Sequence, residues 1–242
     1  MEKYLSVVVP FYNESGNIKP LVEQISAALE KLDKPWEIVL VDDGSTDKSF
    51  QEALDCQENH PQLRILQLNQ NSGQSEAMIA GIRLAHGELI ATLDADLQND
   101  PADIPKLLDE LGDNDMICGY RAKRQDNWWR RFCSKVANTF RRMICPDPVR
   151  DTGCSLKLFK AEVFRYAPFF RGGHRFLATL AEAGGFKVTE TAVNHRARTC
   201  GVTKYGAWGR LKRSFVDLFG MSWLVNRRIR AKVAKEAKAR GC

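Results

Sequence analysis

Two aspartates and a glutamine stand close together directly after an apolar stretch of the chain. Asp94 and Asp96 are two residues apart and Gln98 follows, within the segment LIATLDADLQNDP. The two carboxylates can turn toward one point, and without a cation they would repel each other. Carboxylate and amide oxygens, completed by water and phosphate, are how proteins hold Mg²⁺ or Mn²⁺. The sequence therefore predicts a divalent metal site formed by Asp94, Asp96 and Gln98.

Two other apolar stretches also end in polar clusters. The segment VVVPFYNE places Pro10, Tyr12 and Glu14 after the first stretch. The segment IVLVDDGSTD places Asp42 and Asp43 after the second. An acidic pair in such a place is also common as a helix cap or in a solvated loop. Because ligands of an open α/β sheet bind beyond the carboxyl ends of its strands, we expect all three clusters to face one crevice.

The elements that must position these clusters alternate between strand and helix. Continuous apolar runs rich in β-branched residues occur at 5–9, 36–41, 63–68, 89–93 and 116–118. Such runs are typical of parallel strands that are buried on both faces. Between the first two runs, helical spacing puts five apolar residues on one face: Leu21, Ile25, Ala28, Leu29 and Leu32. Helix starts are indicated at 45–47 and 100–101. The alternation predicts an α/β fold with a mostly parallel, doubly wound sheet.

The alternation changes after residue 121. Four further elements are predicted there: a basic amphipathic helix at 128–144, a strand at 156–159, a helix at 176–183 and a strand at 186–193. We find no internal repeat and no low-complexity segment. The one plausible boundary, near 201–206, divides the chain into a catalytic-type domain, 1–205, and a basic helical tail, 206–242.

Composition narrows the class and the compartment. Hydrophobic residues at 44% and charged residues at 27% are ordinary for a globular protein, which excludes disordered and fibrous classes. The seven scattered cysteines contain no Cys-x-x-Cys pair, which argues against a disulfide framework or a zinc module and fits a reducing cytoplasm. The first residues do not resemble a signal peptide, and no window reaches the roughly 20 apolar residues of a membrane span. We expect a cytoplasmic protein without a transmembrane segment.

The tail carries the surplus of positive charge. After Gly206 the acidic residues are only Asp217 and Glu236, and the basic ones are Arg210, Lys212, Arg213, Arg227, Arg228, Arg230, Lys232, Lys235, Lys238 and Arg240. Helical spacing places one face of the tail at Trp208, Leu211, Phe215, Leu218, Phe219 and Ser222, with Trp223 beside it. This pattern predicts a helix that lies on an anionic membrane surface, peripheral to the inner face of the cytoplasmic membrane. The alternative is a helix packed on the domain, followed by a solvated end.

The motifs PFYNE, VDDGSTD, DADLQNDP, GYR, DTGCSLK and RTCGVTKY occur in this order over roughly residues 4–205. Together they resemble family 2 glycosyltransferases of the GT-A fold, in the group of polyprenyl-phosphate sugar transferases that act on dolichol or undecaprenyl phosphate. The resemblance implies an inverting transfer of a sugar from a nucleotide sugar to a polyprenyl phosphate such as undecaprenyl phosphate, with Mg²⁺ or Mn²⁺ as cofactor. A UDP-sugar donor is favoured, and GDP-mannose is possible.

The resemblance also implies roles for individual residues. Those assigned to nucleotide-sugar binding are Pro10, Tyr12, Glu14, Asp42, Asp43, Asp94, Ala95 and Asp96. The catalytic set is Asp94, Asp96, Arg121, Arg198 and Lys204, in which the three cations face the diphosphate. The acceptor-phosphate set is Arg121, Arg150, Ser155 and Lys157. Many relatives carry arginine where Lys157 stands, and arginine differs because it binds phosphate through two parallel N–H groups.

Other interpretations remain open. A family 2 transferase could act on a glycan or another non-lipid acceptor. A processive synthase does not fit, because the segment QDNWW at Gln125 lacks the Gln-x-x-Arg-Trp pattern. A nucleotidyltransferase would share the metal but not the basic loop at 198–204. A basic nucleic-acid-binding protein is the distant alternative, and we expect no nucleic-acid partner. His174 and His195 are interpreted as structural histidines rather than general bases. The oligomeric state is left without a prediction.

Overall fold

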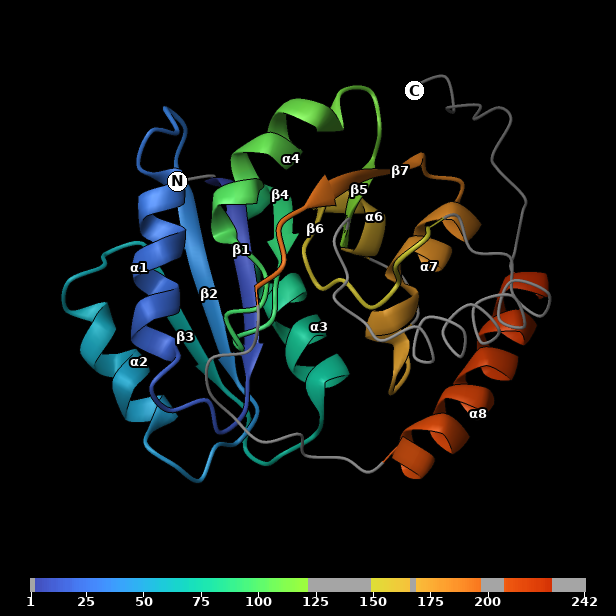
Figure 1. Cartoon of the computed structure of the whole chain (residues 1–242), viewed down its shortest axis with the longest axis horizontal. Coiled ribbons are helices and arrows are strands. Elements are labelled where there is room, and N and C mark those ends of the chain that lie inside the picture. The colour runs from blue at the N-terminus through green and yellow to red at the C-terminus, as the bar shows by residue number, and fades with distance from the viewer. Residues whose placement is uncertain (1–2, 122–148, 166–168, 197–206, 228–242) are drawn as a thin grey trace, which may run out of the picture.

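The described strands form one sheet of seven, in the order β3-β2-β1-β4-β6-β5-β7. The computed structural model describes residues 3–121, 149–165, 169–196 and 207–227. The strands are β1 (Lys3–Phe11), β2 (Trp36–Asp42), β3 (Leu63–Gln67), β4 (Gly87–Thr92), β5 (Met116–Arg121), β6 (Lys157–Lys160) and β7 (Val188–Val193). The helices are α1 (Ile18–Leu29), α2 (Ser49–Gln57), α3 (Gln74–Leu84), α4 (Ile104–Leu111), α6 (Glu162–Arg165), α7 (Leu177–Gly184) and α8 (Ala207–Asn226). Short 3₁₀ helices at Pro101–Asp103 and Gly173–Phe176 precede α4 and α7 (Figure 1).

The sheet is mostly parallel, as the sequence predicts. Strand β1 pairs in parallel with β2 and β4, β2 with β3, and β5 with β7. Strand β6 alone among the described strands runs antiparallel, between β4 and β5. The predicted helix at 128–144 lies outside the described residues. Its neighbours in the sequence, β6, α7 and β7, form within three residues of their predicted starts.

Helices cover both faces of the sheet, and consecutive residues of one strand serve opposite faces. Val7 and Val9 of β1 belong to the core cluster that includes residues of α1, α2 and α4, whereas Val8 belongs to the cluster that includes residues of α3, α6, α7 and α8. This explains why the strand sequences are continuously apolar, since both faces are buried. The predicted face of α1 is confirmed at Leu21 and Ile25, which are fully buried.

From Val216 onward, where its side chains are described, helix α8 packs on the domain through one side. Leu218 and Met221 are buried in the cluster beneath α8, whereas Val216, Phe219 and Trp223 remain exposed. The prediction that placed Leu218 and Phe219 on one lipid-facing stripe is therefore wrong at Leu218, because the core takes that side of the helix. The side chains of Trp208, Leu211 and Phe215 lie outside the described part of the chain, as do residues 228–242. Within the described residues, no helix combines the length and hydropathy needed to cross a bilayer.

A buried carboxylate ties together the amino-terminal ends of the central strands. Glu37 of β2, with a side chain only 1% exposed, accepts hydrogen bonds from Ser6 Oγ at 2.6 Å, His86 N at 2.7 Å and Arg64 Nη1 at 2.8 Å. Burial raises the pKa of Glu37, but these hydrogen bonds and the Arg64 charge outweigh it and hold the pKa below its usual value. The charged form is thus the one that the folded protein stabilises.

We expect Glu37→Gln to destabilise the protein by about 2 to 4 kcal/mol at pH 7, because an amide cannot accept from all three donors. The pKa of Glu37 is lower in the folded than in the unfolded chain. The stabilisation that Glu37 provides is therefore complete above its pKa in the unfolded chain. It disappears as the pH falls through the lower pKa of the folded protein. Urea unfolding at pH 7 and pH 4 should show the difference from wild type narrowing at the lower pH. The exposed Glu58→Gln is the matched control, and equal stabilities of wild type and Glu37→Gln at pH 7 would contradict the expectation.

Candidate active site

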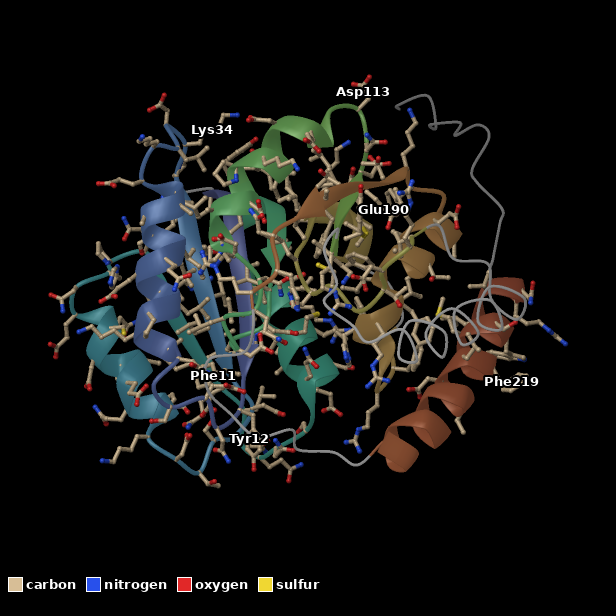
Figure 2. The ribbon with its side chains drawn as sticks, viewed as in Figure 1. Phe11, Tyr12, Lys34, Asp113, Glu190 and Phe219 are labelled. Atoms are coloured by element: carbon tan, nitrogen blue, oxygen red, sulfur yellow. The ribbon has the colours of Figure 1, made fainter. Side chains whose placement is uncertain are left out.

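A hollow of about 200 Å³ opens at the carboxyl ends of β1 and β4. Seven of its lining residues belong to the predicted set: Pro10, Tyr12, Glu14, Asp43, Asp94, Ala95 and Asp96. Four others were not indicated by the sequence: Phe11, Asn71, Gly73 and Gln74. Figure 2 shows Phe11 and Tyr12 at the carboxyl end of β1. The expectation that the three polar clusters face one crevice is confirmed, since residues from all three line this hollow.

Asp42 does not reach the hollow. Its side chain is fully buried at the end of β2. One carboxylate oxygen accepts from Ser45 N at 2.9 Å, and the other accepts from Gln67 Nε2 at 2.9 Å. Asp42 is therefore not among the residues that line the hollow, where the predicted nucleotide contact would be made. It holds the turn after β2 and ties this turn to β3.

Asp43 borders the hollow but uses its carboxylate to fix another loop. Its oxygens accept from Ser72 N at 2.8 Å, Gly73 N at 2.9 Å and Asn71 Nδ2 at 3.0 Å. Burial raises the pKa of the carboxyl and is only partly opposed by these N–H groups. The loop that begins α3 is therefore attached to the end of β2.

The loop after β1 is held by the segment that follows β2. Asn13 adopts a positive φ of 52°, which asparagine tolerates better than most residues. Its Oδ1 accepts from Thr46 N at 2.8 Å, and Ser45 Oγ accepts from Asn13 N at 3.0 Å. The next residue, Glu14, donates its N–H to Ser49 Oγ at 2.7 Å. Ser45 and Thr46 of the VDDGSTD motif, together with Ser49, thus hold the loop from Tyr12 to Glu14 in place.

The loop after β4 turns sharply between its two acidic positions and Gln98. Leu97 has a positive φ of 60° and packs against the core beneath the loop. Such a backbone is unfavourable for leucine and is kept only where packing compensates. The N–H of Gln98 donates to Asp96 Oδ1 at 3.2 Å. Within the described residues, Asn13 and Leu97 are the two non-glycine residues with positive φ, and both lie in loops of the site.

The donor atoms around the hollow fit a hard divalent cation. Asp94 and Asp96 both line it and offer carboxylate oxygens. The described residues contain no group of three or more histidine, cysteine or acidic side chains arranged to hold a metal. A cation here would need further oxygen ligands from phosphate or water, which is the usual situation of Mg²⁺ beside a bound diphosphate. Gln98 is not among the lining residues, so its assignment as a ligand stays a prediction.

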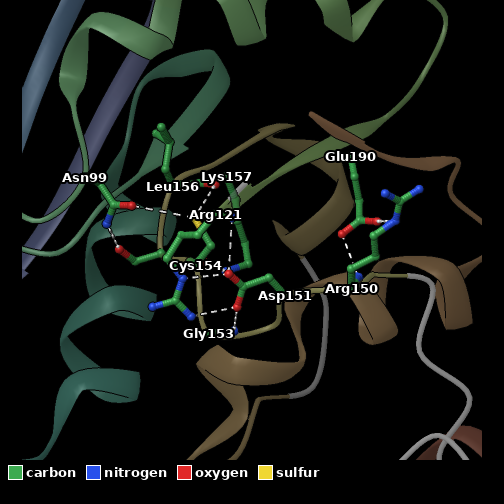
Figure 3. A network of polar contacts seen from close by, with 10 residues as sticks. Asn99, Arg121, Arg150, Asp151, Gly153, Cys154, Leu156, Lys157 and Glu190 are labelled. Atoms are coloured by element: carbon green, nitrogen blue, oxygen red, sulfur yellow. Dashed lines mark hydrogen bonds and ion pairs between the residues drawn. The ribbon is translucent and has the colours of Figure 1, made fainter. Parts of the chain in front are cut away.

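A second polar cluster includes Arg121, Asp151 and Lys157 (Figure 3). The Arg121 guanidinium, at the end of β5, forms two parallel contacts with Asp151, Nε to Oδ2 at 2.6 Å and Nη2 to Oδ1 at 2.8 Å. The N–H of Gly153 also donates to Asp151, at 3.2 Å. Bidentate pairs of this kind are strong and directional. Arg121 therefore fixes the 151–153 turn, a function that its assignment to phosphate binding did not include.

Ser155 joins the two clusters. Its Oγ accepts from the Asp94 N–H at 3.0 Å and from Asn99 Nδ2 at 2.6 Å. Two residues further on, Lys157 is 3% exposed and donates to the Cys154 carbonyl. Within the described residues no carboxylate forms an ion pair with Lys157. A buried ammonium with a single carbonyl partner is costly and favours an anionic ligand.

Arg150 is separated from these groups. Its side chain is 73% exposed and lies 3.6 Å from Glu190 of β7, whose carboxylate also accepts from the Arg150 N–H at 2.6 Å. In Figure 3 this pair stands apart from Arg121, Asp151 and Lys157. The structure therefore brings Arg121, Ser155 and Lys157 together but leaves Arg150 at the periphery.

The segment that precedes Arg198 and Lys204 in the sequence contacts residues 98–103, which follow β4. Asn194 donates to Asp103 twice, at 2.7 and 3.1 Å, and Arg196 pairs with Asp100 at 2.6 Å. The N–H of Arg196 also donates to the Gln98 carbonyl at 2.8 Å. Arg198 and Lys204 themselves lie outside the described residues, so their predicted approach to the diphosphate stays a prediction.

His174 has a structural partner. Its Nδ1 lies 2.6 Å from Ser75 Oγ, which also accepts from the Gly172 N–H at 2.9 Å. Burial, followed by the charges of Arg175 and Lys157, lowers the pKa of His174 to about 3. The imidazole is therefore neutral at pH 7 and is held by Ser75, as the interpretation of a structural histidine requires.

Two solved structures share the fold of this chain. A mannosyltransferase from Pyrobaculum calidifontis, in complex with GDP-Man and Mn²⁺, superposes with a TM-score of 0.62 and 20% identity, covering 94% of this chain and 71% of the other. Glucosyl-3-phosphoglycerate synthase from Mycobacterium tuberculosis, in complex with Mg²⁺ and UDP, superposes with a TM-score of 0.68 and 18% identity, covering 90% and 80%. The fold is that of the GT-A glycosyltransferases.

The family follows from the sequence comparisons. The profile described as Glycosyl transferase family 2 matches residues 6–166, so the chain belongs to this family and is a glycosyltransferase. Dodecaprenyl-phosphate galacturonate synthase of Rhizobium johnstonii is 40% identical over 233 residues, which are 93% of this chain and 68% of the relative. Undecaprenyl-phosphate 4-deoxy-4-formamido-L-arabinose transferase of Pectobacterium carotovorum is 37% identical over 207 residues, 84% and 63% of the two chains. The chain thus spans about two thirds of the length of these relatives.

Proposed function

We propose that the chain transfers a sugar from a nucleotide sugar to a polyprenyl phosphate, with inversion at the anomeric carbon. The observation that carries the proposal is the contact between the two polar clusters. The Asp94 N–H donates to Ser155 Oγ at 3.0 Å, which places the buried Lys157 segment beside the acidic hollow. An acidic donor site and a cationic acceptor site so close together suit transfer between two phosphorylated partners.

The donor would occupy the hollow. Asp94 and Asp96 would hold Mg²⁺ or Mn²⁺, with Gln98 as the proposed third protein ligand. When bound, the cation neutralises the charge that builds on the departing nucleoside diphosphate. Tyr12 and Glu14 would contact the nucleoside, on a loop that the segment after β2 holds in place. A UDP-sugar is favoured because the DTGCSLK and GVTKY motifs resemble those of bacterial undecaprenyl-phosphate transferases.

The acceptor would bind beside Ser155 and Lys157. A polyprenyl phosphate is already an anion, so the reaction needs no general base. Its phosphate oxygen forms a bond to the anomeric carbon while the bond from that carbon to the diphosphate breaks, and the nucleoside diphosphate leaves. A reaction without a general base agrees with the state of His174, whose imidazole is neutral and is held by Ser75. The names of the two relatives, which contain dodecaprenyl and undecaprenyl phosphate, support the same acceptor class.

The proposal is tested by incubating the protein with Mn²⁺, UDP- and GDP-sugars and short polyprenyl phosphates. We expect a lipid-linked sugar phosphate, detected by mass spectrometry, and no product when the metal is chelated. Product on a glycan acceptor with none on the lipid phosphates would contradict the acceptor assignment. The anomeric configuration of the product, compared with that of the donor by NMR, decides inversion.

A lipid acceptor requires contact with a bilayer, and the outer side of α8 suits this contact. Val216, Phe219 and Trp223 are 68%, 58% and 64% exposed, while Leu218 and Met221 attach the opposite side of the helix to the domain. Figure 2 shows Phe219 on the outer side of α8. The basic residues from Arg227 onward follow in the sequence. We propose that this apolar side and these cations bind the anionic inner face of the cytoplasmic membrane.

We expect the double variant Phe219→Ser with Trp223→Ser to lose at least about tenfold in affinity for vesicles containing phosphatidylglycerol, because both side chains leave water on binding. Cosedimentation at increasing salt measures this loss. The matched control is Leu84→Ser, which removes an exposed leucine from the end of α3. Unchanged vesicle binding by the double variant would rule out α8 as the lipid contact.

A further inference from the structure

Gln74 is a residue of the hollow that none of the sequence motifs indicated. It is the first residue of α3 and lines the hollow together with Asp94 and Asp96. Its Nε2 donates to Asp94 Oδ1 at 2.6 Å, a length typical of hydrogen bonds to a charged acceptor. The side chain of Asp94 is thus oriented by a residue twenty positions earlier in the chain.

A neutral donor has a specific consequence at this place. A lysine or arginine in contact with Asp94 would cancel most of the charge of the carboxylate. An amide fixes the direction of one oxygen but adds no positive charge, so the carboxylate keeps its attraction for a cation. The Gln74 amide therefore orients Asp94 without itself adding positive charge to the hollow.

The backbone before Gln74 is fixed by the end of β2. Asp43 accepts the N–H groups of Ser72 and Gly73, at 2.8 and 2.9 Å. Gly73 has a positive φ of 98°, a conformation that glycine adopts without strain. The polar contacts of Asp43 thus set the point at which α3 begins and from which the Gln74 side chain extends.

The residue after Gln74 is fixed from the other side of the site. Ser75 is buried, and its Oγ accepts the Gly172 N–H at 2.9 Å and lies 2.6 Å from His174 Nδ1. The Ser75 hydroxyl thus bridges the Gly172 N–H and the imidazole of His174. Gln74 therefore stands between two anchored neighbours and has little freedom to leave Asp94.

We propose that Gln74 is a positioning residue of the donor site, which holds Asp94 in the orientation that receives the cation and diphosphate of the donor. The inference rests on the proposed function, because the ligand it names is the donor proposed above. It adds a line of contacts from Asp43 through the start of α3 to Asp94, so the carboxyl ends of β2 and β4 are linked.

Gln74→Met tests the proposal, because methionine keeps the length of the side chain and lacks the donor. We expect the affinity for UDP in the presence of Mn²⁺, measured by calorimetry, to fall about tenfold, the effect of one hydrogen bond to a charged group. The melting temperature should stay within about 2 °C of wild type, and KM for the lipid acceptor should not change. Gln74→Glu should lose at least as much affinity, because two facing carboxylates turn each other away.

Gln70→Met is the matched control, since Gln70 is exposed in the same loop before α3. It should bind UDP and Mn²⁺ like wild type. Wild-type affinity in both Gln74→Met and Gln74→Glu would overturn the inference and leave the proposed function intact. A wild-type protein that binds neither UDP nor GDP with Mn²⁺ would overturn the proposed function instead. In that case a crystal structure of Gln74→Met still decides whether Gln74 holds Asp94, because an unchanged Asp94 rotamer would refute it.

Discussion

Asp96→Asn is expected to lower kcat at least about 100-fold under saturating donor and Mn²⁺, because it removes a negative charge from the proposed cation site. The substitution keeps the local structure, since an asparagine Oδ1 can still accept the Gln98 N–H that Asp96 accepts at 3.2 Å. The loss should therefore appear in catalysis and in Mn²⁺ binding but not in the melting temperature. Steady-state rates and Mn²⁺ titration by electron paramagnetic resonance measure the two effects.

The control for this variant is Asp109→Asn, which removes the same charge from an exposed position on α4. It should leave both rate and metal binding unchanged. Normal turnover by Asp96→Asn would refute the metal proposal. Equal losses in the two variants would show that total charge, rather than the position of Asp96, controls the rate.

Lys157→Met is expected to reduce kcat/KM for polyprenyl phosphate about 30-fold, which corresponds to the loss of one charge-assisted contact of about 2 kcal/mol. The folded protein should be as stable as wild type or more stable. Lys157 is buried with the Cys154 carbonyl as its partner, and removing a buried ammonium offsets the lost hydrogen bond. Reduced activity without reduced stability is the pattern of a residue kept for ligand binding. Acceptor kinetics and urea unfolding measure the two quantities.

Lys160→Met on the same strand is the matched control. Lys160 pairs with Asp115 at 2.8 Å near the surface, away from Ser155. Its replacement should leave the acceptor kinetics unchanged. A Lys157→Met variant with wild-type kcat/KM for the acceptor would remove Lys157 from the proposed site, and a large loss of stability would show that the lysine serves the fold instead.

Parts of the site could be predicted because its residues follow directly from strand ends. Parallel strands place their carboxyl ends on one edge of the sheet, so Tyr12, Asp43 and Asp96 meet although they are far apart in the sequence. The contact between Gln74 and Asp94 could not be predicted in the same way. It depends on how α3 lies across the sheet, and an isolated glutamine at a helix start gives no sequence signal.

For two other residues, Asp42 and Arg121, the sequence pattern does not predict which groups the side chain contacts. Asp42 stands beside Asp43 in the motif, yet the alternation of side chains along β2 turns Asp42 into the protein and leaves Asp43 at the hollow. The resemblance implies that Arg121 faces phosphate, which stays a prediction, and the structure adds an ion pair. Strand β5 lies beside β6, and the 151–155 turn that precedes β6 brings Asp151 within 2.6 Å of Arg121. Neither outcome follows from residue types alone.

The order of residue types is enough to predict the mostly parallel α/β sheet and the acidic hollow at its carboxyl edge, because continuous apolar runs can be buried only between two layers of helices. Tertiary structure alone decided the antiparallel place of β6, the burial of Leu218 against the domain and the hold of Gln74 on Asp94. These differ because hydrophobic periodicity fixes only which side of an element is buried. The order of strands and the packing of helices fix which side chains, distant in the chain, then come within hydrogen-bonding distance.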